Sequence, residues 1–323
     1  MSPGARVQAG LLLPTREAAI TGDLDERALV RLAQRAERLG FDSVWAGDSL
    51  VARPRAEPLA LLAAVAAATE RITVGTAALT APLRHPLTAA HAIATIDRLS
   101  EGRLILGLGA GFPYPATAAE FGLAGVPFAE RAGRLMETVR LWRSLWSREP
   151  PGSFTGRYWH FSGLDGLPRP ARIGGPALWL AGGGPSAPRR VAAGFDGWLP
   201  YPPTSREYRE GIDAIHAATA AGPRRDTAPT GGLYVTVLPC TGAEPARQAL
   251  DTYTRAYYGA PIEAMRRSQA FIAGTPEHCL ARLREYVDAG ATHIILRIGA
   301  LDPAPYLEPI AGLAAALTKE PAA

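Results

Sequence analysis

Three consecutive glycines, Gly182, Gly183 and Gly184, follow a short apolar run and lead into Pro185 and Ser186. A strand that ends in glycines before a helix start leaves backbone N–H groups free, and the helix dipole adds partial positive charge. Proline suits the first turn of a helix, because its missing N–H would have no partner there. The pattern predicts a phosphate site, with a flexible turn as the alternative.

Asp48 and Ser49 come directly after another apolar segment, 43–46. A carboxylate at that point can hydrogen-bond a ligand ring, although loop capping is the commoner use of aspartate after a strand. His85, beside Arg84 in a later loop, is a second candidate for handling a proton. We predict Asp48 and His85 as catalytic residues, although the sequence pairs neither with a group that would orient it.

Small residues end two further apolar segments, at 75–78 (Gly-Thr-Ala-Ala) and 107–111 (Gly-Leu-Gly-Ala-Gly). Small side chains let a flat ring approach the backbone closely, but barrel packing and turns also use them. The spacing at 107–111 differs from the dinucleotide fingerprint, and no helix pattern follows at once.

Other catalytic patterns are missing from the sequence. The six histidines have no metal-ligand spacing, so we expect no metal site. Cys240 and Cys279 are far apart in the sequence, which favours two reduced thiols. The lack of a nucleophile elbow, a P-loop or an acid–base set favours chemistry carried by a cofactor that the protein positions.

The composition is that of an ordinary globular protein. The 323 residues are 47% hydrophobic and 20% charged, with a formal net charge of +4. Basic residues do not cluster with aromatic ones, so we expect no nucleic-acid partner. We also expect no membrane span, no signal peptide and a cytoplasmic location.

Eight apolar segments alternate with helical patterns along the chain, as a parallel sheet covered on both faces requires. This alternation predicts one domain over residues 1–323 with an α/β (β/α)8 TIM-barrel fold, and a doubly wound open sheet is the alternative. The strands are expected at 7–13, 43–46, 72–79, 104–109, 178–181, 197–200, 233–238 and 293–298.

Three stretches are longer than usual barrel loops: 112–127 and 148–175 after the fourth strand, and 260–274 after the seventh. Their Gly, Pro and aromatic content favours ordered covering loops. Loops that follow strands lie over the C-terminal face of a barrel, where barrel enzymes hold their active sites.

Several segments together resemble the luciferase-like family, which contains flavin monooxygenases and oxidoreductases that use the deazaflavin coenzyme F420. The resemblance runs in order from about residue 10 to 298. It is carried by segments 36–48, 72–76, 84–111, 181–184, 196–198 and 274–277.

The resemblance implies a cofactor ring over the strand ends, backed by a cis peptide bond between Ala77 and Ala78. It also implies a homodimer and a small organic substrate. We expect Arg206, after the sixth strand, to contact the anionic tail of the cofactor. The cofactor-binding residues so predicted are Asp48, Ser49, Ala77, Ala78, Gly109, Ala110, Gly111, Gly182, Gly183, Gly184, Pro185 and Arg206.

The sequence departs from the family pattern at two positions. Deazaflavin enzymes that oxidise sugar phosphates have glutamate where this chain has Phe112, and histidine where it has Ser49, which puts sugar-phosphate oxidation in doubt. FMN-type members often carry an arginine soon after the fourth strand, but segment 112–121 has no basic residue. This difference favours F420 over FMN.

The resulting hypothesis is F420-dependent hydride transfer to or from an organic small molecule, with reduction of an activated C=C or C=N bond favoured. Phe112, Tyr114 and Tyr201 are candidates to line the substrate pocket. One alternative is an FMN-dependent monooxygenase, and another is a non-catalytic flavin-binding barrel. A barrel lyase would need a Schiff-base lysine, and Lys319 near the C-terminus is badly placed for that role.

Overall fold

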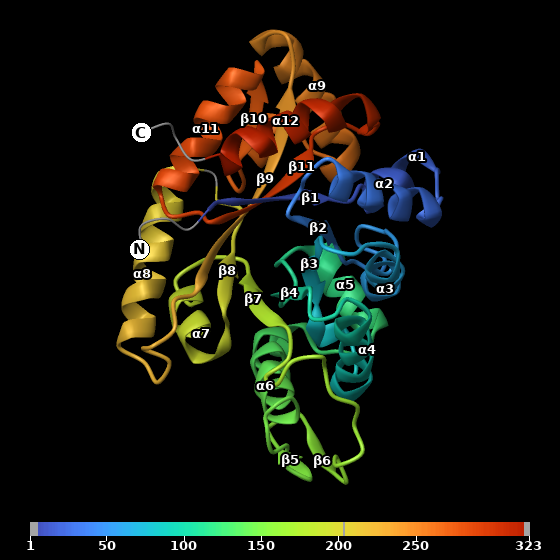
Figure 1. Ribbon diagram of the computed structural model, residues 1–323, viewed down its shortest axis with the longest axis vertical. Helices are drawn as coiled ribbons and strands as arrows, with labels where there is room; N and C mark the ends of the chain where they lie inside the picture. Colours follow the sequence, from blue (N-terminus) through green and yellow to red (C-terminus); the bar gives the residue numbers. More distant parts are fainter. Residues whose placement is uncertain (1–5, 203, 320–323) are drawn as a thin grey trace.

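The computed structural model describes residues 6–202 and 204–319 (Figure 1). The eight apolar segments form a closed barrel, in which every pairing is parallel and β8 pairs with β9 to close the ring. The barrel predicted from the sequence is confirmed, and the open sheet is wrong. Around the barrel the strands are β1 (Gln8–Leu12), β2 (Ser43–Ala46), β3 (Thr73–Thr80), β4 (Leu104–Gly109), β7 (Ala177–Ala181), β8 (Gly197–Leu199), β9 (Thr230–Pro239) and β11 (His293–Ile298).

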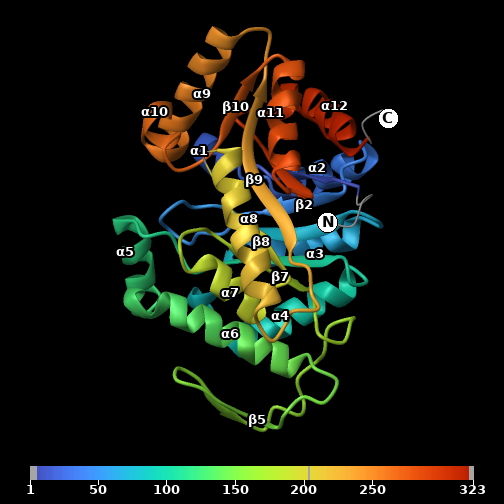
Figure 2. The ribbon, with the colours of Figure 1, turned by 90° about the vertical axis from the view of Figure 1, so that its left-hand side faces the viewer.

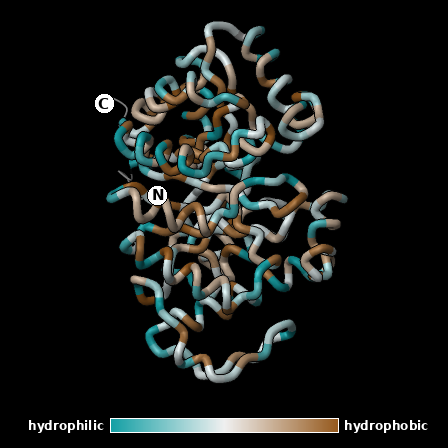
Figure 3. The backbone as a smooth tube through the Cα atoms, turned by 90° about the vertical axis from the view of Figure 1, so that its right-hand side faces the viewer, coloured by the Kyte–Doolittle hydropathy of each residue, from teal (hydrophilic) through white to brown (hydrophobic). Residues whose placement is uncertain are grey.

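Helices surround the strands (Figures 1 and 2), and the hydrophobic positions gather in the centre of the molecule (Figure 3). Several helices begin at a side-chain cap; Asp25, for example, accepts a hydrogen bond from the amide of Arg27. The helices of the outer layer are α2 (Glu26–Arg38), α3 (Pro58–Ala68), α4 (Pro86–Leu99), α6 (Arg131–Leu145), α7 (Ala187–Gly194), α8 (Ser205–Ala220), α11 (Pro276–Asp288) and α12 (Leu307–Thr318).

The three long stretches contain more regular structure than the sequence indicated. Stretch 112–127 contains a helix, 148–175 a hairpin, and 260–274 a short helix followed by a strand that extends the sheet beyond β9. Their segments of three or four residues are too short for a periodic pattern. The additional elements are α1 (Thr15–Thr21), α5 (Pro115–Leu123), β5 (Ser153–Thr155), β6 (His160–Ser162), α9 (Ala243–Tyr258), α10 (Ile262–Met265), β10 (Phe271–Gly274) and the 3-10 turns Ala81–Leu83, Phe128–Glu130 and Ala304–Tyr306.

Two tryptophans fill the floor of the barrel. Trp45 and Trp179 lie with ring centroids 5.4 Å apart, and both meet the ring of His293 edge-on. The hydroxyl of Ser43 lies 2.7 Å from Nε2 of His293 and accepts the indole N–H of Trp45 at 2.7 Å. These packed side chains therefore fill the interior of the barrel at this level.

Glycines make room for these rings. A Cβ on Gly75 would lie 2.5 Å from the Trp45 ring, and one on Gly197 would lie 2.6 Å from the Trp179 ring. Such distances are far shorter than any normal carbon contact. The inward positions of the strands are thus small where the tryptophans are large.

Candidate active site

The predicted site residues on β2, β3, β4 and β7 lie at the carboxyl ends of their strands, which in a parallel barrel is one common rim. The pairing of β3 with β4 shifts register between Thr76 and Leu79. The peptide bond between Ala77 and Ala78 is cis, as the family resemblance implies. Both alanines are partly exposed, so small side chains and backbone face the barrel mouth here.

Asp48 is already paired in the structure. Its carboxylate accepts a hydrogen bond from the amide of Thr80 at 2.8 Å and two from the guanidinium of Arg84 at 2.6 and 3.1 Å. Arg84 also contacts Glu57 at 2.7 Å. Burial by itself lowers the pKa of Arg84, but these two carboxylates outweigh it and raise that pKa. The arrangement ties the ends of β2 and β3 together and leaves the Asp48 side chain only 6% exposed.

Ser49 is held by a carboxylate that the sequence analysis did not identify. Its hydroxyl donates to Glu120 at 2.9 Å, and the same oxygen accepts the backbone amides of Leu50, Val51 (2.8 Å) and Ala52 (3.3 Å). Glu120 belongs to α5 and is 2% exposed. The segment after β4 therefore holds the loop after β2 in place.

The end of β4 offers close access to the backbone. A Cβ on Gly109 would meet its neighbours only at ordinary contact distances, the nearest being Cβ of Ala78 at 3.6 Å. Gly111 has a φ of +90°, a conformation that suits glycine, and Arg131 donates to its carbonyl at 3.3 Å. Ala110 between them is partly exposed. The backbone here lies beside the bulge of β3.

The glycines after β7 form an open cradle. Gly182 and Gly184 have φ angles of +111° and +86°, and a Cβ on any of the three would meet nothing within 4 Å. In the described residues, the amides of Gly183 and Gly184 make no hydrogen bond. Pro185 is exposed, and α7 begins directly afterwards without a side-chain cap. Free amides at a helix start fit the phosphate of a cofactor.

Two predicted residues lie apart from this group. The His85 ring packs edge-on against Trp159 and Phe161 of the hairpin region, at 5.4 and 5.6 Å. Arg206 lies in the first turn of α8 with its side chain 84% exposed, and its nearest carboxylate, on Glu210, is 3.8 Å away. The roles of both residues remain predictions.

The opposite half of the rim carries a set of residues that the sequence analysis missed. Arg297 on β11 is 2% exposed, and its guanidinium donates to the hydroxyl of Thr236. Its carbon Cζ lies 4.7 to 5.6 Å from the centroids of four tyrosine rings. An arginine within an otherwise apolar strand was the available signal. The arginine–tyrosine cluster consists of Arg55, Tyr234, Tyr253, Tyr257, Tyr258 and Arg297.

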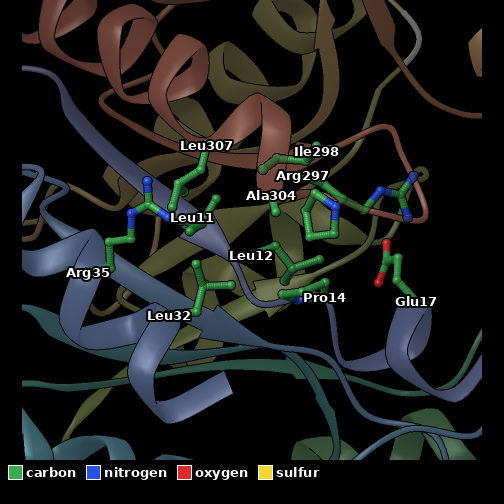
Figure 4. Close-up of a pocket in the computed structure, with 11 residues that line it drawn as sticks. Leu11, Leu12, Pro14, Glu17, Leu32, Arg35, Arg297, Ile298, Ala304 and Leu307 are labelled. Atoms are coloured by element: carbon green, nitrogen blue, oxygen red, sulfur yellow. The ribbon is translucent and has the colours of Figure 1, made fainter. Parts of the chain in front are cut away.

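A small pocket lies beside this cluster, between β1, β11, α1 and α2 (Figure 4). Its cavity volume is about 110 Å³. Arg297 and Glu17 lie at one end and Arg35 at the other, with Leu11, Leu12 and Leu307 between them (Figure 4). The pocket is too small for a flavin, its lining is mostly apolar, and Arg297 is the residue that it shares with the cluster.

In the described part of the chain, no three His, Cys, Asp or Glu side chains gather as metal ligands would. Within residues 6–202 and 204–319, no helix is long and apolar enough to cross a membrane. What the rim does offer is small residues and free amides on one half, and guanidinium and phenol groups on the other. This arrangement can hold a flat, anionic cofactor against a second molecule.

Several known proteins are similar to this chain in sequence. The family model described as luciferase-like monooxygenase matches residues 7–293. An F420-dependent glucose-6-phosphate dehydrogenase of Mycobacterium avium is 30% identical over 311 residues, 87% of this chain and 91% of that protein. A second one, from Intrasporangium calvum, is 39% identical over 182 residues, and there the match spans only 53% of the relative.

Solved structures of low identity share the fold. An F420-dependent secondary alcohol dehydrogenase in complex with an F420–acetone adduct has a TM-score of 0.80 at 18% identity and covers 98% of this chain and all of that one. The oxygenating constituent of 3,6-diketocamphane monooxygenase from Pseudomonas putida, in complex with FMN, has a TM-score of 0.74 at 20% identity, covering 98% and 99%.

Proposed function

The chain belongs to the luciferase-like monooxygenase family, and from that membership we propose an F420-dependent oxidoreductase that transfers hydride to or from a small organic molecule. The observation that carries the proposal is the rim half formed by Ala77, Ala78 and Gly109, with the free amides of Gly183 and Gly184 at its end. Relatives that match nearly the whole chain bear F420-dependent names. We favour reduction of an activated C=C or C=N bond.

The bound deazaflavin would supply a carbon centre that gives or takes hydride. The amides of Gly183 and Gly184 and the start of α7 would hold its phosphate, and Gly182, whose own amide donates to the carbonyl of Leu199 at 3.2 Å, would lead the chain into this turn. The bulge at Ala77 and Ala78 would support the ring from behind. These residues position the cofactor and exclude water, so their contribution is orientation rather than acid–base chemistry.

The proton of the reaction needs a group close to the ring. Asp48 is at the rim, but its bonds to Thr80 and Arg84 favour a positioning role over proton transfer. Tyr201, which follows β8, and Tyr234, on β9, are two candidate phenols, with ring centroids 6.1 Å apart. Burial raises the pKa of Tyr201 to about 12, so it stays protonated at neutral pH and can donate a hydrogen bond.

The substrate is proposed to differ from a sugar phosphate. Phe112 is 42% exposed and stacks on Tyr114 with centroids 5.4 Å apart, which places an aromatic pair where the sugar-phosphate enzymes have an acid. Ser49 is already bound to Glu120. An organic substrate with an apolar part suits this surface better than a sugar ring.

The experiment is a fluorescence titration of the purified protein with F420 and with FMN, followed by turnover with each reduced cofactor, first without oxygen and then with it. We expect tight F420 binding and oxygen-independent reduction of an enone or imine panel. Tight FMN binding with oxygen-dependent product would establish the monooxygenase alternative instead. Cofactor binding without turnover of any acceptor would favour the non-catalytic barrel.

We also propose that residues 1–323 form one domain, that the protein is cytoplasmic and that it forms a homodimer. The homodimer is proposed from the family resemblance. Sedimentation equilibrium measures the oligomeric state directly, and a monomer at micromolar concentration would remove the dimer from the proposal.

A further inference from the structure

The arginine–tyrosine cluster carries more positive charge than its surroundings offset. Arg16 and Arg53 lie around it: Arg16 donates to the carbonyl of Tyr257 at 2.8 and 3.1 Å, and Arg53 lies 5.0 Å from the Tyr258 ring centroid. Among the described residues, Arg16, Arg53, Arg55 and Arg297 have no carboxylate within ion-pair distance. Four guanidinium groups thus converge without a direct anionic partner.

One carboxylate, that of Glu17, does lie nearby. It is 2% exposed and accepts a hydrogen bond from the hydroxyl of Tyr253 at 2.6 Å. Three tyrosines of the cluster do not supply further negative charge. Burial raises the pKa of Tyr234, Tyr253 and Tyr258, so these phenols are neutral at physiological pH. Guanidinium groups keep their proton even when buried, and the excess of positive charge therefore remains.

The two central guanidinium groups are held in place by neutral groups. Arg297 donates to Thr236 at 2.9 Å and to Gln269 at 3.4 Å. Arg55 donates to the carbonyl of Arg53 at 3.1 Å and makes a side-chain hydrogen bond with Tyr257. Fixed cations with neutral supports are a preorganised receptor for an oxyanion, since no ion pair must break when the anion binds.

The position of Arg55 connects this receptor to the reaction site. A Cβ built on Gly47 would lie 2.2 Å from Nη1 of Arg55 and 3.5 Å from the carbonyl oxygen of Ala77. The guanidinium of Arg55 thus lies at the barrel mouth, beside the bulge proposed to support the ring. The cluster spans β9, α9, β11 and the loop after β2, whereas Gly182–184 follow β7, which β8 separates from β9 and which β3 and β4 separate from β2. It is therefore separate from the proposed phosphate cradle.

We propose that the arginine–tyrosine cluster binds an oxyanion of the substrate, a carboxylate or a phosphate, and so selects anionic molecules for this barrel. Only the identification of the bound anion as part of the substrate rests on the proposed function. The anion site itself is argued from the geometry of the described residues. Arginine is the residue that matches both oxyanions, through parallel N–H groups in one plane.

The first experiment measures anion binding without any cofactor. Calorimetric titrations with sodium benzoate and with sodium phosphate, at ionic strength matched with sodium chloride, are made on the wild type, Arg55→Gln and Arg297→Gln. Arg247→Gln is the matched control, because Arg247 is exposed on α9 and pairs with Glu244 at 2.7 Å. Benzoate and phosphate distinguish a carboxylate receptor from a phosphate receptor.

We expect millimolar or tighter binding of at least one oxyanion to the wild type and to the control. Each cluster variant should lose at least about tenfold in affinity, since removal of one guanidinium removes a charge-assisted contact. Arg55 is partly exposed, so its variant should fold even if Arg297→Gln does not. Absence of binding to the wild type, or equal binding to Arg55→Gln, overturns the proposal.

The second experiment separates this inference from the proposed reaction. F420 titrations of the same proteins should give equal affinities; a loss confined to the cluster variants would assign the cluster to the cofactor and overturn the proposal. With reduced F420, α,β-unsaturated acids should show at least about tenfold higher kcat/KM than their methyl esters, and a preference for the esters overturns it. If the oxyanion binds but neither acid nor ester reacts, the anion site stands and the proposed reaction fails.

Discussion

The barrel contains two groups of glycines that serve opposite purposes. On the floor, Gly75 and Gly197 lie against the rings of Trp45 and Trp179, where an added Cβ would collide. At the rim, the cradle that includes Gly183 faces open space. The floor glycines make room for the protein itself, whereas the rim glycines leave room for something else.

A small residue in a strand gives only limited information about its surroundings. Its presence indicates that another group approaches the backbone closely, but the partner is not visible in the sequence. For Gly75 the partner is a tryptophan 30 positions earlier in the chain. For Gly183 the chain supplies no partner, and that leaves a ligand. Substitutions on the floor should therefore reduce stability, and substitutions at the rim should reduce binding.

The largest effect on binding is expected for Gly183→Asp. A new carboxylate would lie among the amides proposed to hold the cofactor phosphate, and like charges repel, so we expect at least about a 100-fold loss of F420 affinity. The fold should be unchanged, because a Cβ built here meets nothing within 4 Å. Fluorescence titration measures the affinity, and thermal unfolding checks the fold.

Gly166→Asp provides the matched control, since Gly166 is also exposed and a Cβ there meets nothing within 4 Å. It should bind F420 like the wild type. Unchanged affinity in Gly183→Asp would remove the cradle from the site and make the two glycine groups equivalent.

At the floor of the barrel, the buried His293 should make the stability of the fold depend on pH. Burial lowers its pKa to about 4, and its Nδ1 has no hydrogen-bond partner in the described residues. The unfolded chain takes up a proton near pH 6.5 while the folded chain does not, so stability is full above that pH and falls as the pH drops toward 4. The loss should be on the order of 3 kcal/mol.

Urea unfolding of the wild type and of His293→Gln at pH values from 4 to 8 measures this contribution, since the variant lacks the titrating ring. The difference between their free energies of unfolding should change with pH only below about 6.5. Parallel curves for the two proteins would contradict the assignment to the floor.

Gly75→Ala should destabilise the fold by roughly 2 kcal/mol, because the methyl group would overlap Trp45 and overpacking strains a core. F420 affinity of the folded fraction should be unchanged. Denaturant unfolding and fluorescence titration measure both quantities. A Gly75→Ala protein of normal stability but weak cofactor binding would place the ligand deeper in the barrel than proposed.

Asp48→Asn should have the smallest effect, about 1 to 2 kcal/mol of stability, because it weakens the bonds to Arg84. A positioning role predicts that the pH profile of kcat keeps its shape. Loss of one limb of the profile in this variant would instead identify Asp48 as the proton-transferring group.

The sequence predicted the parts of the molecule that have local patterns. The eight strands are confirmed because each is a nearly continuous apolar run, and the cis bond after Ala77 follows the family resemblance. The arginine–tyrosine cluster was missed because its members come from a loop, two strands and the end of α9. No spacing rule connects Arg55 with Tyr257 and Arg297, which meet only when the barrel closes.

The contact of Glu120 with the loop after β2 has a consequence for how this protein can change. One carboxylate on α5 accepts the amides of Val51 and Ala52, a few residues before Arg55. Two segments about seventy residues apart in the sequence are therefore held together at the entrance of the barrel. Replacing α5 with the corresponding helix of a relative should preserve the fold only if the loop after β2 is replaced with it. A change of substrate range by such replacement would therefore need both segments.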